Sequence, residues 1–405
     1  MPTLTRAATA AVIALSLSLP LALAGPSAAS GSAAPSSARP PATAVVGAAD
    51  ARAEGPAELP RPTGPLPVGR SVLHLVDRSR PDPWVPTADG RELMVTLHYP
   101  ARRPAAGPAA PYATTPETRA LLEGYGLGDA VPAADLSATR TWAGTDVRPA
   151  PGRYPLVVLS PGFTASRYTL TALAEDLAAR GYVVASVDHA YESLGIETPD
   201  GRLLTCAACG PVSEGQVPEG VITAGRARDV SYVLDRLTGN RPAWKYAGTI
   251  DRRRIGMAGH SIGGASAATA MLADGRVRAG VNMDGAFHDT LPEEGLGGRP
   301  FMLLGTDDEM HRPGGLDHTW DAAWQRFGGW KRWLTLADSD HFTFTDAAVF
   351  LDHFGVPRAP LPGDRALALT RAYVAAFFDR HLKGAARPLL DGPSAADPEV
   401  LFHNP

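Results

Sequence analysis

Apolar residues recur along the chain in two patterns: short continuous runs, and longer stretches with apolar positions three and four residues apart. The short runs are typical of buried β-strands, and the wider spacing is typical of helices with one apolar face. From Pro155 onward the two patterns alternate several times, as expected for a parallel sheet covered by helices. We therefore predict an α/β fold with a mostly parallel central sheet and helices on both faces. The expected strands are 156–160, 183–187, 254–258, 277–283, 301–304 and 332–336.

Two further strands are expected before this region. Residues 71–76 are mostly apolar, and residues 92–99 alternate between apolar and polar side chains. The turn-forming segment Arg80-Pro81-Asp82-Pro83 lies between them, so we expect an antiparallel hairpin. Residues 104–151 are rich in Pro and Gly, which predicts an irregular excursion on the surface.

The first 64 residues differ in composition from the rest of the chain. Arg6 precedes an apolar stretch, and Ala22-Leu23-Ala24 has the small residues of a cleavage site, so residues 1–24 are expected to be a signal peptide. An uncleaved membrane anchor is the alternative, although the stretch is short and weakly apolar for a span. Residues 25–64, rich in Ala, Pro and Ser, predict a disordered leader. We then expect one domain over 65–405, in a secreted protein.

Composition and charge narrow the class of protein. The 405 residues are 44% hydrophobic and carry a formal net charge of -4, which suits a globular protein with a large core and gives no extreme charge that would favour binding to nucleic acid. The two cysteines are Cys206 and Cys209. In an exported protein a local disulfide is the favoured interpretation, with free thiols, a redox-active pair or half of a zinc site as the alternatives.

The segment Gly259-His260-Ser261-Ile262-Gly263-Gly264 lies between an expected strand and a helix rich in small residues. A serine in this strand–turn–helix context, with glycine two positions away on each side, is the signature of a nucleophile elbow. The tight turn requires small neighbours, and the helix N-terminus directs its positive dipole at a developing oxyanion. Ser261 is therefore the candidate nucleophile, and the N–H of Ile262 is a candidate oxyanion donor.

A serine hydroxyl needs a base to take its proton and an acid to orient that base. His341 follows the last expected strand, at the carboxyl edge where active sites of open parallel sheets gather, and it is the candidate base. Spacing alone leaves the acid open, because Asp284 follows one strand and Asp307 and Asp308 follow the next. Other histidines lack such a position at the end of a strand: His311, His318 and His353.

The aromatic residues near these loops are candidates for an acyl or lipid-chain pocket, although such residues more often belong to the core. They are Phe163, Tyr168, Tyr191, Phe287, Phe342 and Phe344. The acidic run at 307–309 lacks the spacing of a calcium loop, and acyl transfer by a serine needs no metal. We expect no cofactor and no metal.

Several segments carry a resemblance to a known family. They are Arg80-Pro81-Asp82-Pro83-Trp84, Leu97-His98-Tyr99-Pro100-Ala101, Leu159-Ser160-Pro161-Gly162-Phe163, the run 259–265, Asn282-Met283-Asp284-Gly285 and the run 340–346. With these, residues 69–384 resemble the secreted, calcium-independent platelet-activating-factor acetylhydrolases of the plasma type and their bacterial lipase-like relatives. The resemblance implies the α/β-hydrolase fold for the domain 65–405.

The resemblance also implies roles for individual residues. In that family the acid ends the strand after the elbow helix, which corresponds to Asp284. Bacterial cutinases and polyester hydrolases, which the chain also resembles, use the position of Asp307 or Asp308. For the second oxyanion donor the resemblance indicates the N–H of Phe163, in the turn after the strand that ends at Ser160.

The activity implied is hydrolysis of carboxylic esters through an acyl-enzyme, with short-chain lipid esters such as 1-alkyl-2-acetylglycerophosphocholine as substrates. A triacylglycerol lipase or a cutinase-like polyester hydrolase is the nearest alternative, followed by a secreted acyltransferase and a catalytically idle binding protein. The expected partners are a small-molecule or lipid ester and, transiently, lipid surfaces. The protein itself is expected to be a monomer.

Overall fold

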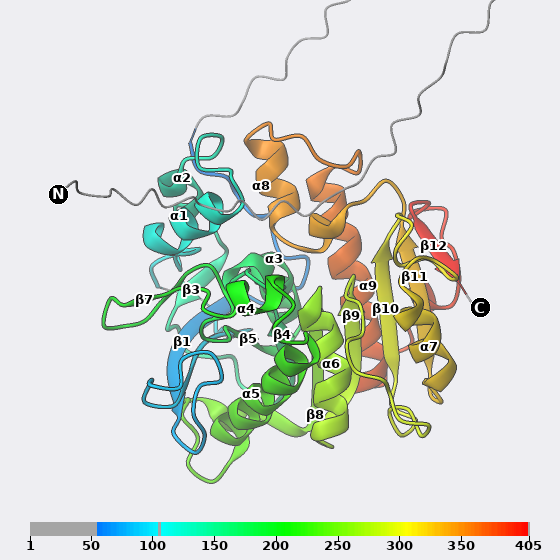
Figure 1. Ribbon diagram of the computed structural model, residues 1–405, viewed down its shortest axis with the longest axis horizontal. Helices are drawn as coiled ribbons and strands as arrows, with labels where there is room; N and C mark the ends of the chain where they lie inside the picture. The colour runs from blue at the N-terminus through cyan, green and yellow to red at the C-terminus, as the bar shows by residue number, and fades with distance from the viewer. Residues whose placement is uncertain (1–54, 104–106, 404–405) are drawn as a thin grey trace, which may run out of the picture. The chain divides into compact units, whose positions relative to one another are not determined.

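The structure is a computed structural model that describes residues 55–103 and 107–403. Its main sheet contains β1 (Val68–Asp77), β2 (Arg91–Pro100), β3 (Ala143–Thr145), β4 (Tyr154–Ser160), β5 (Val183–Val187), β8 (Ile250–His260), β9 (Val277–Met283), β10 (Phe301–Thr306), β11 (Lys331–Leu336) and β12 (Val400–His403). These ten strands lie in the order β12-β11-β10-β9-β8-β4-β5-β2-β1-β3 (Figure 1).

The centre of the sheet is parallel and its edges are mixed. Strands β5, β4, β8, β9, β10 and β11 pair in parallel. The pairs β1–β2, β2–β5 and β11–β12 are antiparallel. The predicted parallel sheet and its opening hairpin are confirmed. Strands β3 and β12 were not predicted, because runs of three and four residues carry no readable period.

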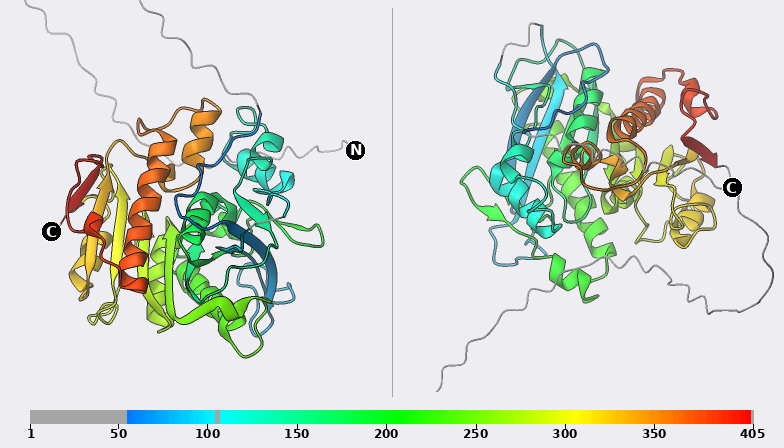
Figure 2. Two further views of the ribbon diagram at one scale, coloured as in Figure 1. Left: turned by 180° about the vertical axis from the view of Figure 1, so that it is seen from behind. Right: turned by 90° about the horizontal axis from the view of Figure 1, so that it is seen from above.

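Helices cover both faces of the sheet, as predicted (Figures 1 and 2). On one face, α5 (Gly220–Thr238), α6 (Ile262–Ala273) and α7 (His318–Arg326) share a buried apolar cluster with Leu156 and Val158 of β4. On the other, α3 (Thr171–Ala179), α8 (Ala347–His353) and α9 (Gly363–Lys383) share one with Val157 and Leu159. Successive residues of β4 thus serve opposite layers. Among the helices of the described residues, none is long and apolar enough to cross a membrane.

The Pro/Gly-rich excursion contains two short helices, α1 (Thr115–Gly124) and α2 (Ala133–Ser137). Thr114 caps the start of α1 in a capping box. Its side chain accepts from the backbone N–H of Glu117, and the side chain of Glu117 accepts from the backbone N–H of Thr114. Apolar residues of both helices join a third cluster with the 3-10 turn η1 (Arg167–Leu170) and α8: Leu122, Leu136, Tyr168 and Phe350. The excursion therefore forms a folded layer over these elements.

Residues 55–64 pack against the domain, so the disordered leader predicted for 25–64 ends too late. Ala57 and Leu59 are each 1% exposed, and the indole N–H of Trp142 donates to the carbonyl of Leu59 at 2.7 Å. Thr63 donates from its backbone N–H and its hydroxyl to the buried carboxylate of Asp176, each at 2.7 Å. These contacts join residues that are far apart in the sequence, so the composition of residues 25–64 alone could not predict them. The expected signal peptide, 1–24, lies outside the described residues.

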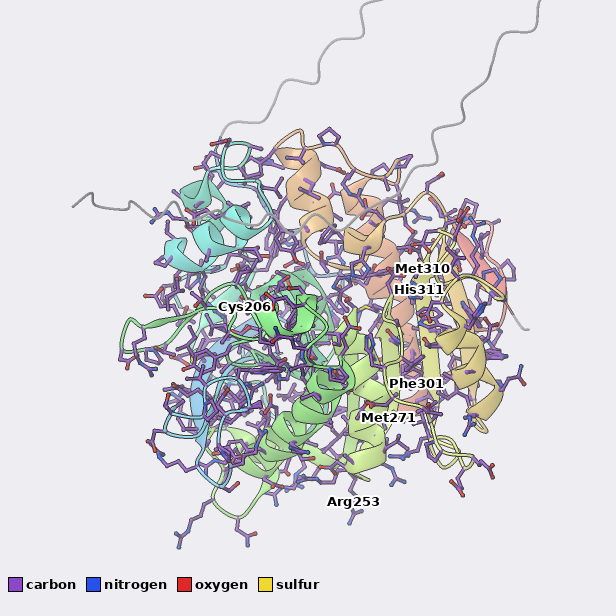
Figure 3. All side chains as sticks on the ribbon, in the orientation of Figure 1. Cys206, Arg253, Met271, Phe301, Met310 and His311 are labelled. Atoms are coloured by element: carbon purple, nitrogen blue, oxygen red, sulfur yellow. A yellow bond between two sulfur atoms is a disulfide. The ribbon has the colours of Figure 1, made fainter. Side chains whose placement is uncertain are left out.

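The two cysteines form a disulfide in a loop at one side of the sheet. A hairpin of β6 (Ile196–Glu197) and β7 (Leu203–Leu204) leads to the short helix α4 (Cys209–Ser213). Cys206 and Cys209 are bonded at the start of α4, with their Cα atoms 5.4 Å apart (Figure 3). The favoured interpretation of the pair is confirmed.

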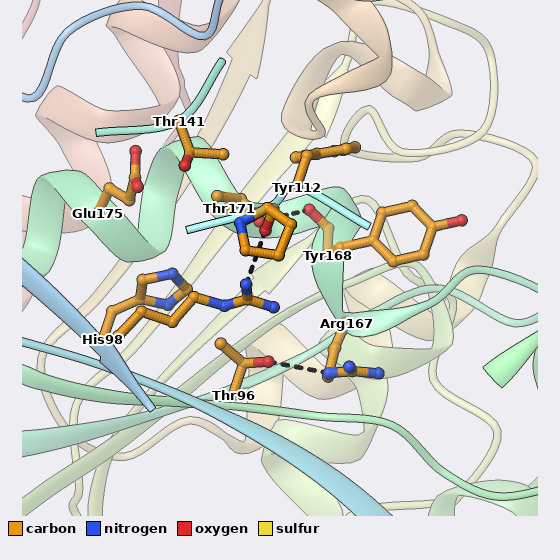
Figure 4. A pocket seen from close by; sticks show the side chains of 10 residues that line it. Thr96, His98, Tyr112, Thr141, Arg167, Tyr168, Thr171 and Glu175 are labelled. Carbon is orange, nitrogen blue, oxygen red and sulfur yellow. Dashed lines mark hydrogen bonds between the residues drawn. The ribbon is translucent and has the colours of Figure 1, made fainter. Parts of the chain in front are cut away.

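A small polar cavity of about 10 Å³ lies between β2, η1 and α3 (Figure 4). Arg70, His98, Arg167 and Glu175 contribute to its lining, and both ring nitrogens of His98 lack a hydrogen-bond partner among the described residues. Burial, together with the nearby arginine charges, lowers the pKa of His98 to about 3, so its ring is neutral. The volume suits about one water molecule, which would bridge these groups.

We predict that a chain beginning at residue 65 is less stable than one beginning at residue 55. The shorter chain loses the burial of Ala57 and Leu59 and both bonds from Thr63 to Asp176. The loss corresponds to about 3–6 kcal/mol. Thermal unfolding followed by circular dichroism should show a midpoint several degrees lower, and Leu59→Ala in the longer chain should reproduce part of the change. Equal midpoints for the two chains would contradict a stabilising role for this segment.

Candidate active site

Ser261 lies in a strained turn between β8 and α6. Its φ of 55° and ψ of -132° fall in a region that residues with a side chain rarely adopt. Its N–H donates to the carbonyl of Met283 at 2.7 Å, which ties the turn to the end of β9. The Ser261 side chain is half-buried and makes no hydrogen bond to a described residue, so its hydroxyl is free to turn toward a ligand.

The glycines around Ser261 are required by close approaches of the backbone. A Cβ on Gly259 would lie 2.2 Å from the carbonyl carbon of Gly263, and a Cβ on Gly263 would lie 2.1 Å from the carbonyl oxygen of Ser160. A Cβ on Gly264 would lie 2.0 Å from the side-chain oxygen of Asn282. The tight turn between strand and helix that the sequence predicts around Ser261 is therefore present, and these close approaches are its steric cause.

The structure brings His341 and Asp284 together. His341 begins the 3-10 turn η3 (His341–Phe344) after β11, and Asp284 directly follows β9. The Nδ1 atom of His341 lies 2.6 Å from Oδ2 of Asp284. The side chain of His341 is 42% exposed while that of Asp284 is 1% exposed. A buried carboxylate thus holds one nitrogen of an accessible imidazole and leaves the other nitrogen free.

The carboxylate of Asp284 is surrounded by donors. Its Oδ1 accepts from the N–H of Thr306 at 2.9 Å and from the hydroxyl of Thr306 at 3.0 Å, and it lies 2.9 Å from Nδ1 of His311. Burial works to raise the pKa of Asp284, but the hydrogen bonds from His311 and His341 outweigh burial and hold this pKa well below its usual range. Asp284 is therefore ionised. The contact with His311 was missed by sequence reasoning, which treated His311 only as a rival base.

Asp307 and Asp308, the other candidate acids, lie elsewhere. Asp308 accepts from the hydroxyl of Thr306 at 2.9 Å and from the backbone N–H groups of Met310 and His311. Asp307 pairs with Arg312 at the surface. Both carboxylates shape the loop after β10 and neither contacts His341.

His260, within the elbow, anchors the loop that carries His341. Its Nε2 donates to the backbone carbonyl of His341 at 2.6 Å, and the two rings lie 4.5 Å apart between centroids. Burial and the adjacent His341 lower the pKa of His260 to about 3, so it stays neutral and acts as a donor. This positioning contact links the elbow to the turn after β11.

Of the two expected oxyanion donors, Ile262 lies at the elbow and Phe163 lies in the turn after β4. Ile262 is the first residue of α6, where backbone N–H groups have no partner within the helix. Gly162 lies beside the nucleophile, since a Cβ there would sit 3.4 Å from Cβ of Ser261, and Phe163 follows it. Neither the N–H of Phe163 nor that of Ile262 donates to another described backbone group.

Comparisons with known proteins agree with this geometry. The model of the family described as "Platelet-activating factor acetylhydrolase, isoform II" matches residues 133–198. A protein of Arthroderma benhamiae named "Probable 1-alkyl-2-acetylglycerophosphocholine esterase" is 28% identical over 377 residues, 85% of this chain and 93% of its own length. A bis(hydroxyethyl) terephthalate hydrolase of Streptomyces coelicolor is 26% identical over 231 residues, 55% of this chain and 62% of that protein.

A solved structure decides the family. The ferulic acid esterase from Streptomyces cinnamoneus is 46% identical, with a TM-score of 0.77, over 86% of this chain and 99% of that one. The chain is a carboxylic ester hydrolase of the α/β-hydrolase superfamily. The family resemblance and the fold class drawn from the sequence are confirmed.

A buried ionic network holds the turn after β4 in this hydrolase. The guanidinium of Arg226, on α5, donates to the carbonyl of Pro161 at 2.5 Å, to the hydroxyl of Ser160 at 3.1 Å and to Glu192 at 2.8 Å. Glu192 also pairs with Arg91 at 2.6 Å, and its backbone carbonyl accepts from the N–H of Thr164 at 2.9 Å. Sequence reasoning missed this set, because residues from distant segments give no local signal.

The segment Arg80–Trp84, singled out as a family motif, supplies further members of the network. Asp82 pairs with Arg91 at 3.0 Å, and Arg80 pairs with Asp229, which also pairs with Arg91 at 2.9 Å. The indole of Trp84 donates to Glu192 at 3.0 Å. The motif therefore contributes to the network that holds the turn after β4.

Some of the aromatic residues near the site belong to the apolar core, and others are half-buried at the edge of the site, here called the rim. Tyr168, Phe287 and Phe344 are buried in apolar clusters, and Tyr191 lines an open groove with His74 and Arg202. Phe163 and Phe342 remain half-buried near the elbow. Tyr125, which sequence reasoning missed, packs edge-on against Phe342 with centroids 5.7 Å apart and hydrogen-bonds Thr164 through its hydroxyl at 2.7 Å. The excursion 107–151 thus contributes to the rim.

No group of three or more metal-ligating side chains occurs in residues 55–103 and 107–403.

We predict that Arg226→Met lowers both stability and turnover. The substitution leaves Glu192 with one guanidinium partner in a buried site and removes the donors to Ser160 and Pro161, a loss of about 3–5 kcal/mol in the free energy of unfolding. Urea unfolding and ester hydrolysis measure the two effects. Arg226→Lys should be intermediate, because one ammonium group cannot replace the planar fork. The exposed Arg228 on the same helix offers the control Arg228→Met, which should change little; comparable losses in both variants would contradict the assignment.

Proposed function

We propose that this hydrolase is a serine esterase in which Ser261 is the nucleophile, His341 the general base and Asp284 the acid that orients His341. The observation that supports it best is the 2.6 Å contact between Asp284 and Nδ1 of His341, at the edge of the sheet where the elbow presents Ser261. The contact fixes the tautomer with a proton on Nδ1, so Nε2 is an acceptor.

In the acylation step, Oγ of Ser261 forms a bond to the ester carbonyl carbon while its proton passes to Nε2 of His341. The carbon–alkoxy bond then breaks, and the same proton passes from His341 to the leaving alcohol. In the deacylation step His341 takes a proton from a water molecule while the water oxygen forms a bond to the acyl carbon. The bond between that carbon and Oγ of Ser261 then breaks, the carboxylic acid leaves, and the proton passes from His341 back to Oγ.

The carbonyl oxygen gains negative charge in each tetrahedral intermediate. We assign its stabilisation to the N–H groups of Phe163 and Ile262, assisted by the N-terminal dipole of α6. One such donor contributes about 3 kcal/mol to stabilisation of the transition state. Because the turn that contains Phe163 is held by Arg226 and Glu192, the donor is positioned before substrate binds.

For substrate we propose esters of small carboxylic acids, with short-chain lipid esters first among them. The named esterase of Arthroderma benhamiae, matched over 93% of its length, supports this class. Esters of aromatic acids are the second candidate. The 46% identity to a ferulic acid esterase and the Tyr125–Phe342 pair at the rim support it, because an edge-on aromatic pair offers apolar faces to a flat acyl group.

We propose that the protein is exported and acts as a monomer, with transient contact to lipid surfaces. The sequence at 1–24 has the features of a signal peptide, and a disulfide between Cys206 and Cys209 suits an oxidising compartment.

Ser261→Ala is expected to abolish turnover, by at least about 10⁴-fold, and to leave the circular dichroism spectrum unchanged. The measurement is hydrolysis of p-nitrophenyl acetate, butyrate and decanoate, of methyl ferulate and of 1-alkyl-2-acetylglycerophosphocholine by the full chain. Preference for the acetyl esters supports the lipid class, and preference for ferulate supports the aromatic class. Turnover in Ser261→Ala near that of the wild type would reject the nucleophile.

Asp284→Asn and Asp308→Asn separate the two candidate acids. The first change removes the charge that orients His341 and should lower kcat by about 10³- to 10⁴-fold. The second weakens contacts to the loop after β10 and should cost less than about tenfold. A greater loss in Asp308→Asn would transfer the role to the loop after β10.

A further inference from the structure

His311 makes a second imidazole contact to the acid of the proposed triad. It follows β10, where Figure 3 labels it beside Met310. Its Nδ1 lies 2.9 Å from Oδ1 of Asp284, while His341 takes the other oxygen. On its far side, Nε2 lies 3.3 Å from Oδ2 of Asp317, the residue that caps α7. One imidazole is thus placed between two carboxylates.

The position of His311 is fixed by its surroundings. Its ring lies 4.6 Å from that of Trp320, whose indole N–H donates to the carbonyl of Gly285 at 2.7 Å. The indole of Trp333 donates to the backbone carbonyl of His311 at 3.1 Å. Since both ring nitrogens face carboxylates and the side chain is 9% exposed, His311 cannot reach the nucleophile or a water in the cleft as a base.

The charge of His311 follows from this geometry. Burial works to lower its pKa, but the hydrogen bond with Asp284 and the negative charges of Asp284 and Asp317 outweigh burial and raise the pKa of His311 to about 10. The ring is therefore a cation over the range in which an esterase works. Its positive charge lies against the same carboxylate that attracts a proton to His341.

We propose that His311 is a positioning residue that offsets the charge of Asp284, fixes the carboxylate that His341 contacts and so supports the action of His341 as a base. The proposal rests on the triad of the proposed function. A carboxylate beside an imidazole favours the protonated ring, and a cation on the opposite oxygen of that carboxylate reduces this preference. Without His311, we expect the acid limb of the pH profile of catalysis to lie at higher pH.

Other charged groups around His311 do not reverse this argument. Asp284 at the end of β9 and Asp317 at the start of α7 face the ring directly. In the loop that contains His311, the carboxylate of Asp308 accepts from the backbone N–H of His311, and Asp307 is paired with Arg312. The neighbouring strand contributes Trp333, whose ring faces His403. Across Asp284 lies His341, whose protonation is the event measured.

The experiment compares full-length wild type with His311→Asn. The Asn amide can place an N–H near the position of Nδ1, so it keeps a donor to Asp284 and removes the charge. We expect the acid limb of the pH profile of kcat/KM for p-nitrophenyl acetate to move up by about one pH unit, so that relative activity on this limb falls about tenfold. Asp317→Asn should move it in the same direction by less, because Asp284 still faces His311.

His74→Asn is the matched control. His74, on β1, also pairs with a carboxylate, that of Glu92 on β2 at 2.8 Å, but it makes no contact with Asp284. This variant should leave the acid limb unchanged. A shift of less than about 0.3 pH unit in His311→Asn, with a native circular dichroism spectrum, would overturn the proposal, as would an equal shift in His74→Asn.

Nitrogen-15 NMR of the histidine rings tests the charge separately from activity. The signals of His311 are identified as those that are missing from the spectrum of His311→Asn. In the wild type and in Ser261→Ala, these signals should show both ring nitrogens protonated at pH 7.5. A neutral ring would overturn the proposal whatever the kinetics. Conversely, turnover retained in Ser261→Ala would reject the proposed function while the NMR result still reports the charge of His311.

Discussion

The negative charge of Asp284 is buried at the carboxyl edge of the sheet, and the arrangement of the surrounding loops depends on how it is neutralised. A buried carboxylate is costly unless donors and cations surround it. Here the donors come from three segments: Thr306 at the end of β10, His311 in the loop that follows, and His341 after β11. Each segment must take up its observed position for the charge to be satisfied. The same contacts orient the imidazole next to the elbow, so stability and site geometry have one electrostatic cause.

A second buried charge set stabilises the opposite side of the elbow. Arg226 and Arg91 share Glu192, and Arg226 reaches the carbonyl of Pro161 in the turn after β4. An ion pair of this kind is weak evidence for net stability, because desolvation offsets attraction. Its consequence is instead geometric: Arg226 would lose its hydrogen bonds to Ser160 and Pro161 if the turn moved. Ser261 is thus held between two sets of buried charges, which together restrict the loops on either side of it.

Periodicity and a family resemblance were enough to predict the sheet, its helices on both faces and the contact between Asp284 and His341. The small residues around Ser261 were predictable because the turn that requires them lies within six consecutive positions, 259–264. His311 and Arg226 were not, since their roles depend on partners far away in sequence, such as Asp284 and Pro161. Residues 55–64 were misjudged for the same reason: composition describes what a segment can bury alone, and Leu59 is buried by other parts of the chain.

In the proposed function, the residues assigned to chemistry and those assigned to selection of an ester come from different regions of this fold. Ser261, Asp284 and His341 follow strands of the central sheet, where the pairing register leaves little freedom. Tyr125 instead belongs to the excursion, which reaches the site through one hydrogen bond to Thr164 and one ring contact with Phe342. Residues of a surface excursion can change without disturbing the buried charges of the sheet. Relatives named for a phospholipid, a terephthalate and a ferulate ester are therefore compatible with one catalytic frame.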